Sequence, residues 1–242
     1  MNLEPNRTVR EFAVEIPGAT RLFEKVGIDY CCGGQRSLAD ACSKAGLPVK
    51  DVISSLQSAV ASHSPAEEPN FLTASLNELI GHIHDEHHVY TKNEITRLGE
   101  LIDKVCIAHG LNHPELIQLR VLFQTLCAEL VAHMRKEEVV LFPYVVGMED
   151  AVRNSRPFVT PPFVTVANPV RRMMMEHDHA GDLLKKMRQL TLDYTAPSNA
   201  CFSYKTLYQA LDELEKDLHQ HIHLENNILF PRAVELESSF LK

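Results

Sequence analysis

The stretch His133-Met-Arg-Lys-Glu-Glu-Val-Val-Leu-Phe-Pro143 returns, with its key positions kept, as His221-Ile-His-Leu-Glu-Asn-Asn-Ile-Leu-Phe-Pro231. Both copies read H-x-x-x-E-x-x-x-L-F-P, and the second begins 88 residues after the first. Residues four apart in an α-helix lie on the same face about one turn apart, so each copy presents an imidazole beside a carboxylate. We expect the proline of each copy to end the regular helix.

A single His–Glu pair of this kind is usually a solvent-exposed ion pair. Two pairs in the same apolar context are harder to explain in this way, because a solvated pair has no need of the Leu-Phe-Pro that follows both copies. We therefore interpret the two copies as two halves of one buried site.

The composition and net charge of the chain exclude some classes of binding partner and indicate its location. The chain has 242 residues and a formal net charge of −8, which argues against nucleic acid or an anionic membrane as the main partner. No apolar run approaches the length that spans a bilayer, and the first residues lack the apolar core of a secretory signal. We therefore expect a cytoplasmic protein whose six cysteines are kept reduced.

The helical patterns predict an all-α protein with two parts. Residues 1–62 have the start and stop signals of several short helices, among them the capping pattern Thr8-Val-Arg-Glu11. Residues 63–70 are polar and contain proline, which is typical of a linker. Residues 71–242 contain four long amphipathic segments, starting near residues 75, 114, 170 and 203. We expect these four to form an antiparallel bundle.

In both copies of the motif the histidine and glutamate fall on the apolar stripe of their helix. A buried carboxylate is costly unless it is paired or binds a metal ion, so a metal site in the bundle core is the simplest explanation. The third helix offers His177 at the same depth. On the first helix, His88 matches the repeat spacing best, with His87 as the alternative. The candidate metal ligands are therefore His88, His133, Glu137, His177, His221 and Glu225.

Six protein ligands are too many for one tetrahedral ion and suit two ions about 3.5–4 Å apart, bridged by the carboxylates. Nitrogen and oxygen donors without thiolate favour non-haem iron, with manganese or zinc as alternatives. Ferritin-like di-iron proteins use Glu-x-x-His, three residues apart, whereas this chain uses His-x-x-x-Glu, four apart.

The paired motifs resemble those of the hemerythrin-like bundles. The oxygen carriers of that superfamily place a second histidine four residues after the histidine of the third helix, and this chain has Gly181 at that position. This departure argues against simple reversible oxygen carriage.

The amino-terminal half resembles a more specific family. Phe23-Glu-Lys-Val-Gly-Ile-Asp-Tyr-Cys-Cys-Gly-Gly34, followed by Leu38-Ala-Asp-Ala-Cys42, is similar to the small cysteine-bearing domain of the ScdA/YtfE-type proteins for repair of iron centres. The resemblance implies two non-haem iron ions per chain, oxo- or hydroxo-bridged, on the six ligands given above. It also implies action under nitrosative and oxidative stress, in which damaged iron–sulfur clusters are restored.

Cys31 and Cys32 are neighbours and cannot close an unstrained disulfide with each other. We expect the glycines that follow to leave these thiols accessible, in a redox or iron-transfer role, against the alternative of half-buried packing residues. Cys106, Cys127 and Cys201 stand alone within helical patterns and are predicted to be small packing residues.

From the residues and the resemblance together we expect a di-iron protein that donates iron to iron–sulfur proteins with damaged clusters, and not a turnover enzyme. One alternative is a di-iron oxidoreductase acting on nitric oxide or another oxidant. A second is a module that senses oxygen or nitric oxide, each of which is a candidate small ligand. The oligomeric state is left open, with a homodimer as one alternative.

Overall fold

The computed structural model describes residues 3–62, 70–157 and 162–240. Within these ranges every regular element is a helix, and the only extended pairing is an isolated bridge between Thr8 and Ser37. The prediction of an all-α protein is therefore confirmed. Of the predicted linker, residues 63–69 lie outside the described residues, so the domain boundary at residue 70 stays a prediction.

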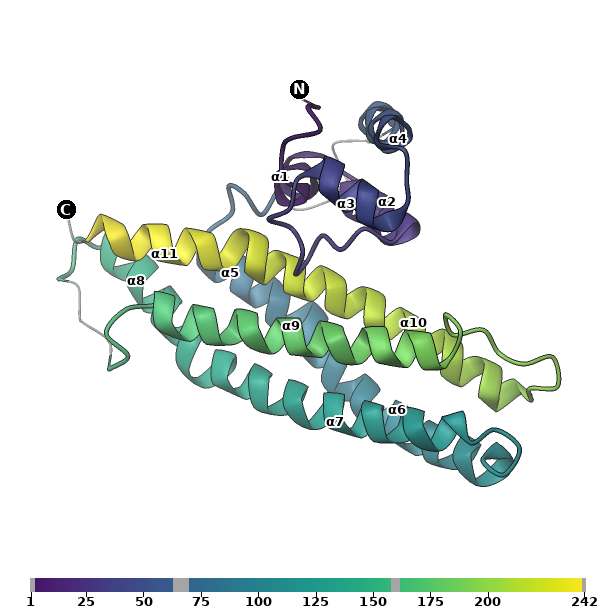
Figure 1. Ribbon diagram of the computed structural model, residues 1–242. Coiled ribbons are helices and arrows are strands. Elements are labelled where there is room, and N and C mark those ends of the chain that lie inside the picture. Colours follow the sequence, from purple (N-terminus) through teal and green to yellow (C-terminus); the bar gives the residue numbers. More distant parts are fainter. Residues whose placement is uncertain (1–2, 63–69, 158–161, 241–242) are drawn as a thin grey trace.

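The first four helices form a group of their own at the amino-terminal end (Figure 1). They are α1 (Val9–Glu15), α2 (Ala19–Val26), α3 (Leu38–Ala45) and α4 (Val49–Ser62). Thr8 caps α1 as predicted, because its hydroxyl accepts from the Glu11 N–H and the Glu11 carboxylate accepts from the Thr8 N–H. Phe12 and Phe23 are fully buried in the core of this group, to which the bundle contributes Ile222.

Four long helical rods follow, and three of them contain a π-helical turn, labelled η. The first rod is α5 (Leu76–His82), η1 (Ile83–His88) and α6 (Val89–His109), and the second is α7 (Glu115–Lys136), η2 (Glu137–Leu141) and α8 (Phe142–Arg153). The third is α9 (Ala167–Leu190), and the fourth is α10 (Phe202–His223), η3 (Leu224–Leu229) and α11 (Phe230–Ser239). The rods run side by side in alternating directions, with α7 against α6 and α9, and α10 against α6 (Figure 1). This is the expected antiparallel bundle.

The prolines of the repeated motif do not end their helices. In η2 the Phe142 N–H bonds to the Glu137 carbonyl, five residues back, and the rod then continues as α8 with Pro143 in its first turn. Pro231 lies in the first turn of α11 in the same way. The prediction that these prolines end the helix is therefore wrong. A proline ring crowds the preceding turn of an α-helix, and the wider π turn gives it space.

Apolar residues fill the bundle on both sides of one polar layer. Leu119, Leu126 and Leu211 belong to a cluster at the α6–α7 loop end, and Leu79 and Phe142 belong to a second cluster at the α8 end. The histidines and glutamates of the repeated motif fall between these clusters. The core therefore holds the candidate site at mid-height in the bundle, away from both ends.

One stretch, Glu115–Arg153, is long and apolar enough to cross a membrane by length and composition, which differs from the expectation from the sequence. This stretch is the second rod, whose Leu119 and Leu126 lie in the bundle core. It also carries His133 and Glu137, which are both buried. An apolar face turned toward neighbouring helices accounts for its composition.

Candidate metal centre

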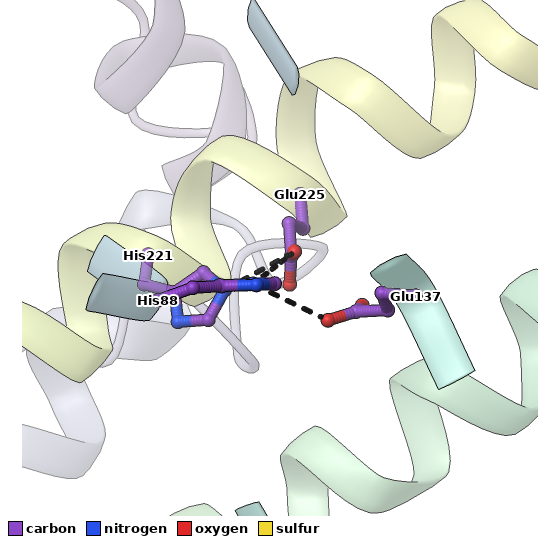
Figure 2. Close-up of side chains that lie close together, drawn as sticks. All are labelled: His88, Glu137, His221 and Glu225. Carbon is purple, nitrogen blue, oxygen red and sulfur yellow. Dashed lines mark hydrogen bonds and ion pairs between the residues drawn. The ribbon is translucent and has the colours of Figure 1, made fainter. Parts of the chain in front are cut away.

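The structure brings all six candidate ligands into one buried layer. The exposed fraction of each is 4 % or less, and Glu137 and Glu225 are completely buried. They form two groups, each with its possible ligand atoms within 4.8 Å of one another. The first group is His88, Glu137, His221 and Glu225 (Figure 2), and the second is His133, Glu137, His177 and Glu225.

Each group is centred on a pair of imidazoles. The Nε2 atoms of His88 and His221 are 3.1 Å apart, and those of His133 and His177 are 2.9 Å apart. Figure 2 shows His88 and His221 converging on one point, which two carboxylates also face: Glu137 from the second rod and Glu225 from the same rod as His221. A separation this short places the ring nitrogens of each pair around a common position.

The two glutamates are shared between the groups. Glu137 directs Oε1 at His133 Nε2, 3.2 Å away, and Oε2 at His88 Nε2, 3.5 Å away. Glu225 directs Oε1 at His221 Nε2 and Oε2 at His177 Nε2, both at 3.1 Å. Each carboxylate therefore spans both imidazole pairs, one oxygen to each, as a bridging ligand between two ions would.

Hydrogen bonds at Nδ1 fix the ring tautomers of His88 and His133. His88 Nδ1 lies 2.8 Å from Glu138 Oε1, and His133 Nδ1 lies 2.9 Å from Glu176 Oε2. A carboxylate oxygen accepts only, so both Nδ1 atoms carry hydrogen and the neutral ring keeps its lone pair at Nε2. The lone pairs then point into the cluster, as metal-bound histidines require.

His177 is held by an amide in place of a carboxylate. Its Nδ1 donates to Asn226 Oδ1 at 2.9 Å, and Asn226 Nδ2 donates to the Cys31 carbonyl at 3.1 Å. The second bond identifies which amide atom is the oxygen. His177 and His133 therefore both present lone pairs across 2.9 Å, an arrangement that is repulsive without a cation between them.

The chemistry of the cluster fits a metal. All four carboxylate oxygens of Glu137 and Glu225 are buried and have no hydrogen-bond partner within the described part of the chain. Burial acts to lower the pKa of His133, but the charges of Glu137 and Glu225 outweigh it and raise this pKa to about 9. Buried carboxylates thus draw positive charge into the layer, and a bound metal ion supplies that charge in place of protons.

The Nδ1 partners Glu138, Glu176 and Asn226 are residues that the sequence reasoning missed. Burial favours the neutral form of Glu176, but hydrogen bonds from Lys136, His133 and Arg172 outweigh it and lower its pKa to about 2. The sequence repeat could have pointed to two of these three residues, because Glu138 and Asn226 each directly follow the glutamate that the two copies share.

His87, the alternative to His88, lies outside both groups. It is buried, its Nδ1 lies 2.9 Å from Asp217 Oδ1, and its ring stacks on that of His221 with centroids 5.7 Å apart. His87 therefore packs against the ring of the candidate ligand His221 and helps to hold it in position.

The Cys31–Cys32 loop covers the bundle beside His177. Cys32 Sγ is 3.7 Å from the His177 carbonyl oxygen, and a Cβ built on Gly181 would lie 3.7 Å from the same sulfur. Gly181 is the position where the oxygen carriers have a histidine, so in this chain the thiol of Cys32 faces that place. The amino-terminal group therefore docks at Gly181, the position at which this chain differs from the oxygen carriers.

The expected accessibility of the two thiols is wrong for Cys31, whose exposed fraction is 6 %, whereas Cys32 is half-buried. The loop is pressed against the bundle, because Asn226 and Asn227 donate hydrogen bonds to the Cys31 and Tyr30 carbonyls. The hydrogen bond with Cys32, together with burial, raises the pKa of Cys31, so that its thiol stays protonated at neutral pH.

Among the other cysteines, Cys201 differs from the prediction of a packing residue. It is exposed, and its Sγ lies 3.1 Å from His109 Nε2 at the far end of the bundle. Cys106 is buried and Cys127 half-buried, as expected for packing.

Comparison with known proteins agrees with this architecture. Residues 5–60 match the family model ScdA_N, a domain of unknown function, and residues 79–233 match the hemerythrin HHE cation binding domain. The chain is 35% identical to a probable iron-sulfur cluster repair protein of Haemophilus influenzae, over 93% of this chain and 95% of that protein.

Two further relatives carry similar names. The iron-sulfur cluster repair protein YtfE of Dickeya chrysanthemi is 36% identical over 96% of this chain and 98% of its own length. The iron-sulfur cluster repair protein ScdA of Staphylococcus epidermidis is 30% identical over 93% and 96%. The chain therefore belongs to the family of iron-sulfur cluster repair proteins that join an ScdA_N domain to a hemerythrin HHE cation binding domain.

Proposed function

We propose that the buried layer binds two non-haem iron ions, one in each group of ligands. His88 and His221 would hold the first ion, His133 and His177 the second, and both glutamates would bridge them together with an oxo or hydroxo group. The observation that carries this proposal is the orientation of the carboxylates, since Glu137 and Glu225 each turn one oxygen toward either imidazole pair.

The proposed function is the repair of oxidatively or nitrosatively damaged iron–sulfur clusters by donation of this iron. The relatives are named for cluster repair, which supports the choice of recipient. The ligand set supports release, because it contains neutral imidazoles and shared carboxylates but no thiolate, the ligand that soft metals prefer. Iron is then the cargo, and the chain's own residues bind it and release it.

The amino-terminal domain, residues 1–62, would engage the recipient or control release through Cys31 and Cys32, and the bundle domain, residues 71–242, would store the iron. Cys32 supports this division, since its half-buried sulfur lies 3.7 Å from the backbone of the candidate ligand His177. We propose the cytoplasm as the location, where recipient iron–sulfur proteins are made.

Transfer of labelled iron tests the proposal. Full-length protein loaded with isotopically labelled iron is mixed with an apo iron–sulfur enzyme, and recovered activity and label are compared with an equal amount of free ferrous iron. We expect two labelled ions per chain and recovery above the free-iron level. Glu225→Ala should lose bound iron and fail in transfer, whereas Glu86→Ala, an exposed carboxylate outside both groups, should behave as wild type. Recovery equal to that with free iron would refute donation.

A second candidate function is reduction of nitric oxide or another small oxidant, and one cavity favours it. A pocket of about 370 Å³ between α7 and α9 is lined by His133 and His177, so a small molecule can approach the second group from solvent. Turnover of nitric oxide by the reduced protein with an electron donor would support this function. A spectral change without turnover or iron loss would instead indicate sensing.

A further inference from the structure

A second cavity lies between the amino-terminal helices and the rods α9 and α10. Its volume is about 730 Å³, and its lining includes Asp29, Cys31 and Cys32. These three side chains have their possible ligand atoms within 4.8 Å of one another. They lie outside the two groups of the bundle and form a separate cluster of two thiols and a carboxylate, which we name the outer thiol site.

The separations in this cluster match those around a tetrahedral ion. Metal–sulfur bonds of about 2.3 Å and metal–oxygen bonds of about 2.1 Å, at tetrahedral angles, place two sulfurs about 3.8 Å apart and a sulfur and an oxygen about 3.6 Å apart. Cys31 Sγ is 3.8 Å from Cys32 Sγ and 3.6 Å from Asp29 Oδ1. The cluster therefore needs little rearrangement to surround an ion.

Backbone contacts hold the carboxylate in this position. Asp29 Oδ1 accepts hydrogen bonds from the Cys32 N–H at 3.0 Å and the Gly33 N–H at 2.9 Å. Only glycine fits at position 33, because a Cβ there would lie 2.9 Å from the Asp29 carbonyl oxygen. The loop is thus folded back on Asp29, and both thiols stay beside its side chain.

We propose that the outer thiol site binds one thiophilic divalent transition-metal ion through Asp29, Cys31 and Cys32. The fourth coordination position would face the cavity and remain open to water or to a thiolate of another protein. Two thiolates and a carboxylate suit iron(II), zinc or cobalt(II) and differ from the nitrogen-rich set in the bundle.

The charges balance when the ion binds. The two thiols each release a proton, so that two thiolates, one carboxylate and a doubly charged cation leave one negative charge. Lys185 lies 3.5 Å from Asp29 Oδ2 and offsets that charge. Binding and release are ligand exchange with proton transfer to solvent, and neither the sulfurs nor the ion changes oxidation state.

The position of the site suggests a role for it as the point of handover, and this role rests on the proposed iron donation. Cys32 lies against the backbone of His177 on one side and lines the solvent-open cavity on the other. An ion leaving the bundle on the side of the cysteine loop would thus meet thiolates before it reaches a recipient protein. The binding of a metal to the site does not depend on that role.

Cobalt(II) titration tests the site. Co²⁺ is added without oxygen to full-length, iron-loaded, reduced protein, so that the bundle sites are already occupied. We expect a thiolate-to-cobalt charge-transfer band that saturates at one equivalent, with release of two protons. Cys31→Ser and Cys32→Ser should each abolish the band. Asp29→Asn, which keeps an acceptor for the backbone N–H groups, should weaken Co²⁺ binding about tenfold or more.

Cys201→Ser is the matched control, since this exposed thiol lies 3.1 Å from His109 Nε2 and also offers cobalt a sulfur, together with an imidazole. It should leave the band unchanged, and equal iron content in all variants would show that the bundle is intact. The absence of a band, or a band that survives either Cys31→Ser or Cys32→Ser, overturns the site. If the band forms but labelled iron is not transferred, the proposed function fails and the site stands. If labelled iron is transferred but no band forms, the site fails and the proposed function stands.

Discussion

The side chain of Asn226 has two roles that can be tested separately, because its two polar atoms have different partners. Nδ2 donates to the Cys31 carbonyl at 3.1 Å, and Oδ1 accepts from His177 Nδ1 at 2.9 Å. Asn226→Asp keeps the acceptor for His177 and removes the donor to Cys31. Asn226→Ala removes both. The pair of variants therefore tests separately how the cysteine loop and the candidate metal ligand are held.

The magnitude follows from the buried hydrogen bond. Removing the donor leaves the Cys31 carbonyl without a partner in a buried place, which costs about 1–3 kcal/mol. If opening of the loop limits access to the Cys31 thiol, this cost raises the rate of alkylation of Cys31 roughly 5- to 150-fold in both variants. Loss of the acceptor for His177 should weaken iron binding about 10- to 100-fold, and only in Asn226→Ala.

The assay is alkylation resolved by peptide mass spectrometry, so that Cys31 is followed apart from the other thiols, together with iron loss to a ferrous chelator. Asn227→Asp is the control, because Asn227 donates to the Tyr30 carbonyl at 2.9 Å and is not bonded to a candidate ligand. It should speed alkylation and leave iron binding as in wild type. The reasoning is refuted if Asn226→Asp loses iron as readily as Asn226→Ala, or if neither variant changes the alkylation of Cys31.

Three further predictions concern stability. Burial acts to lower the pKa of His219, but the hydrogen bond and charge of Glu24 outweigh it and raise this pKa above 6.5. Protonated His219 therefore stabilises domain docking below pH 6.5, and this contribution is lost as pH rises through the raised pKa, so His219→Gln should flatten the alkaline fall in unfolding temperature. Leu119→Ala, at a fully buried position, should lower the free energy of unfolding by about 2–5 kcal/mol in denaturant titrations. The exposed Val121→Ala should change it by less than about 0.5 kcal/mol. Removal of iron by a chelator should lower the unfolding temperature, and restored iron should recover it, since iron binds the folded chain through a site that unfolding destroys; equal unfolding temperatures would contradict a buried metal site.

The sequence was sufficient for the helices and for the set of residues that meet in the bundle. Four-residue spacing predicts that His133 and Glu137 share a helix face, and their near-repetition at His221 and Glu225 indicates one common layer. The first deduction depends only on helical periodicity, and the second depends on the repetition of the motif. His88 was selected over His87 by the spacing of the repeat, and the structure places His88 in the cluster and His87 beside it.

Features that depend on contacts between distant segments were not predictable in this way. The π turn before Pro143 changes the hydrogen-bond register without any sequence pattern that we recognised. Glu176 looks like an ordinary surface carboxylate, and only the packing of α9 on α7 brings it to His133 Nδ1. The burial of Cys31 depends on docking of the loop against η3, 195 residues away in sequence, through the Asn226 amide.

The two copies of the repeat differ at the position after the shared glutamate, and that difference has a physical reason. Glu138 and Asn226 occupy the same place in the two copies, and each accepts a hydrogen bond from the Nδ1 of a candidate ligand on another rod. Glu138 also accepts from Lys92, as a carboxylate can. Asn226 must in addition donate to the Cys31 carbonyl, and a carboxylate cannot donate. An amide at position 226 is therefore what allows one side chain to bond to both the candidate ligand His177 and the cysteine loop.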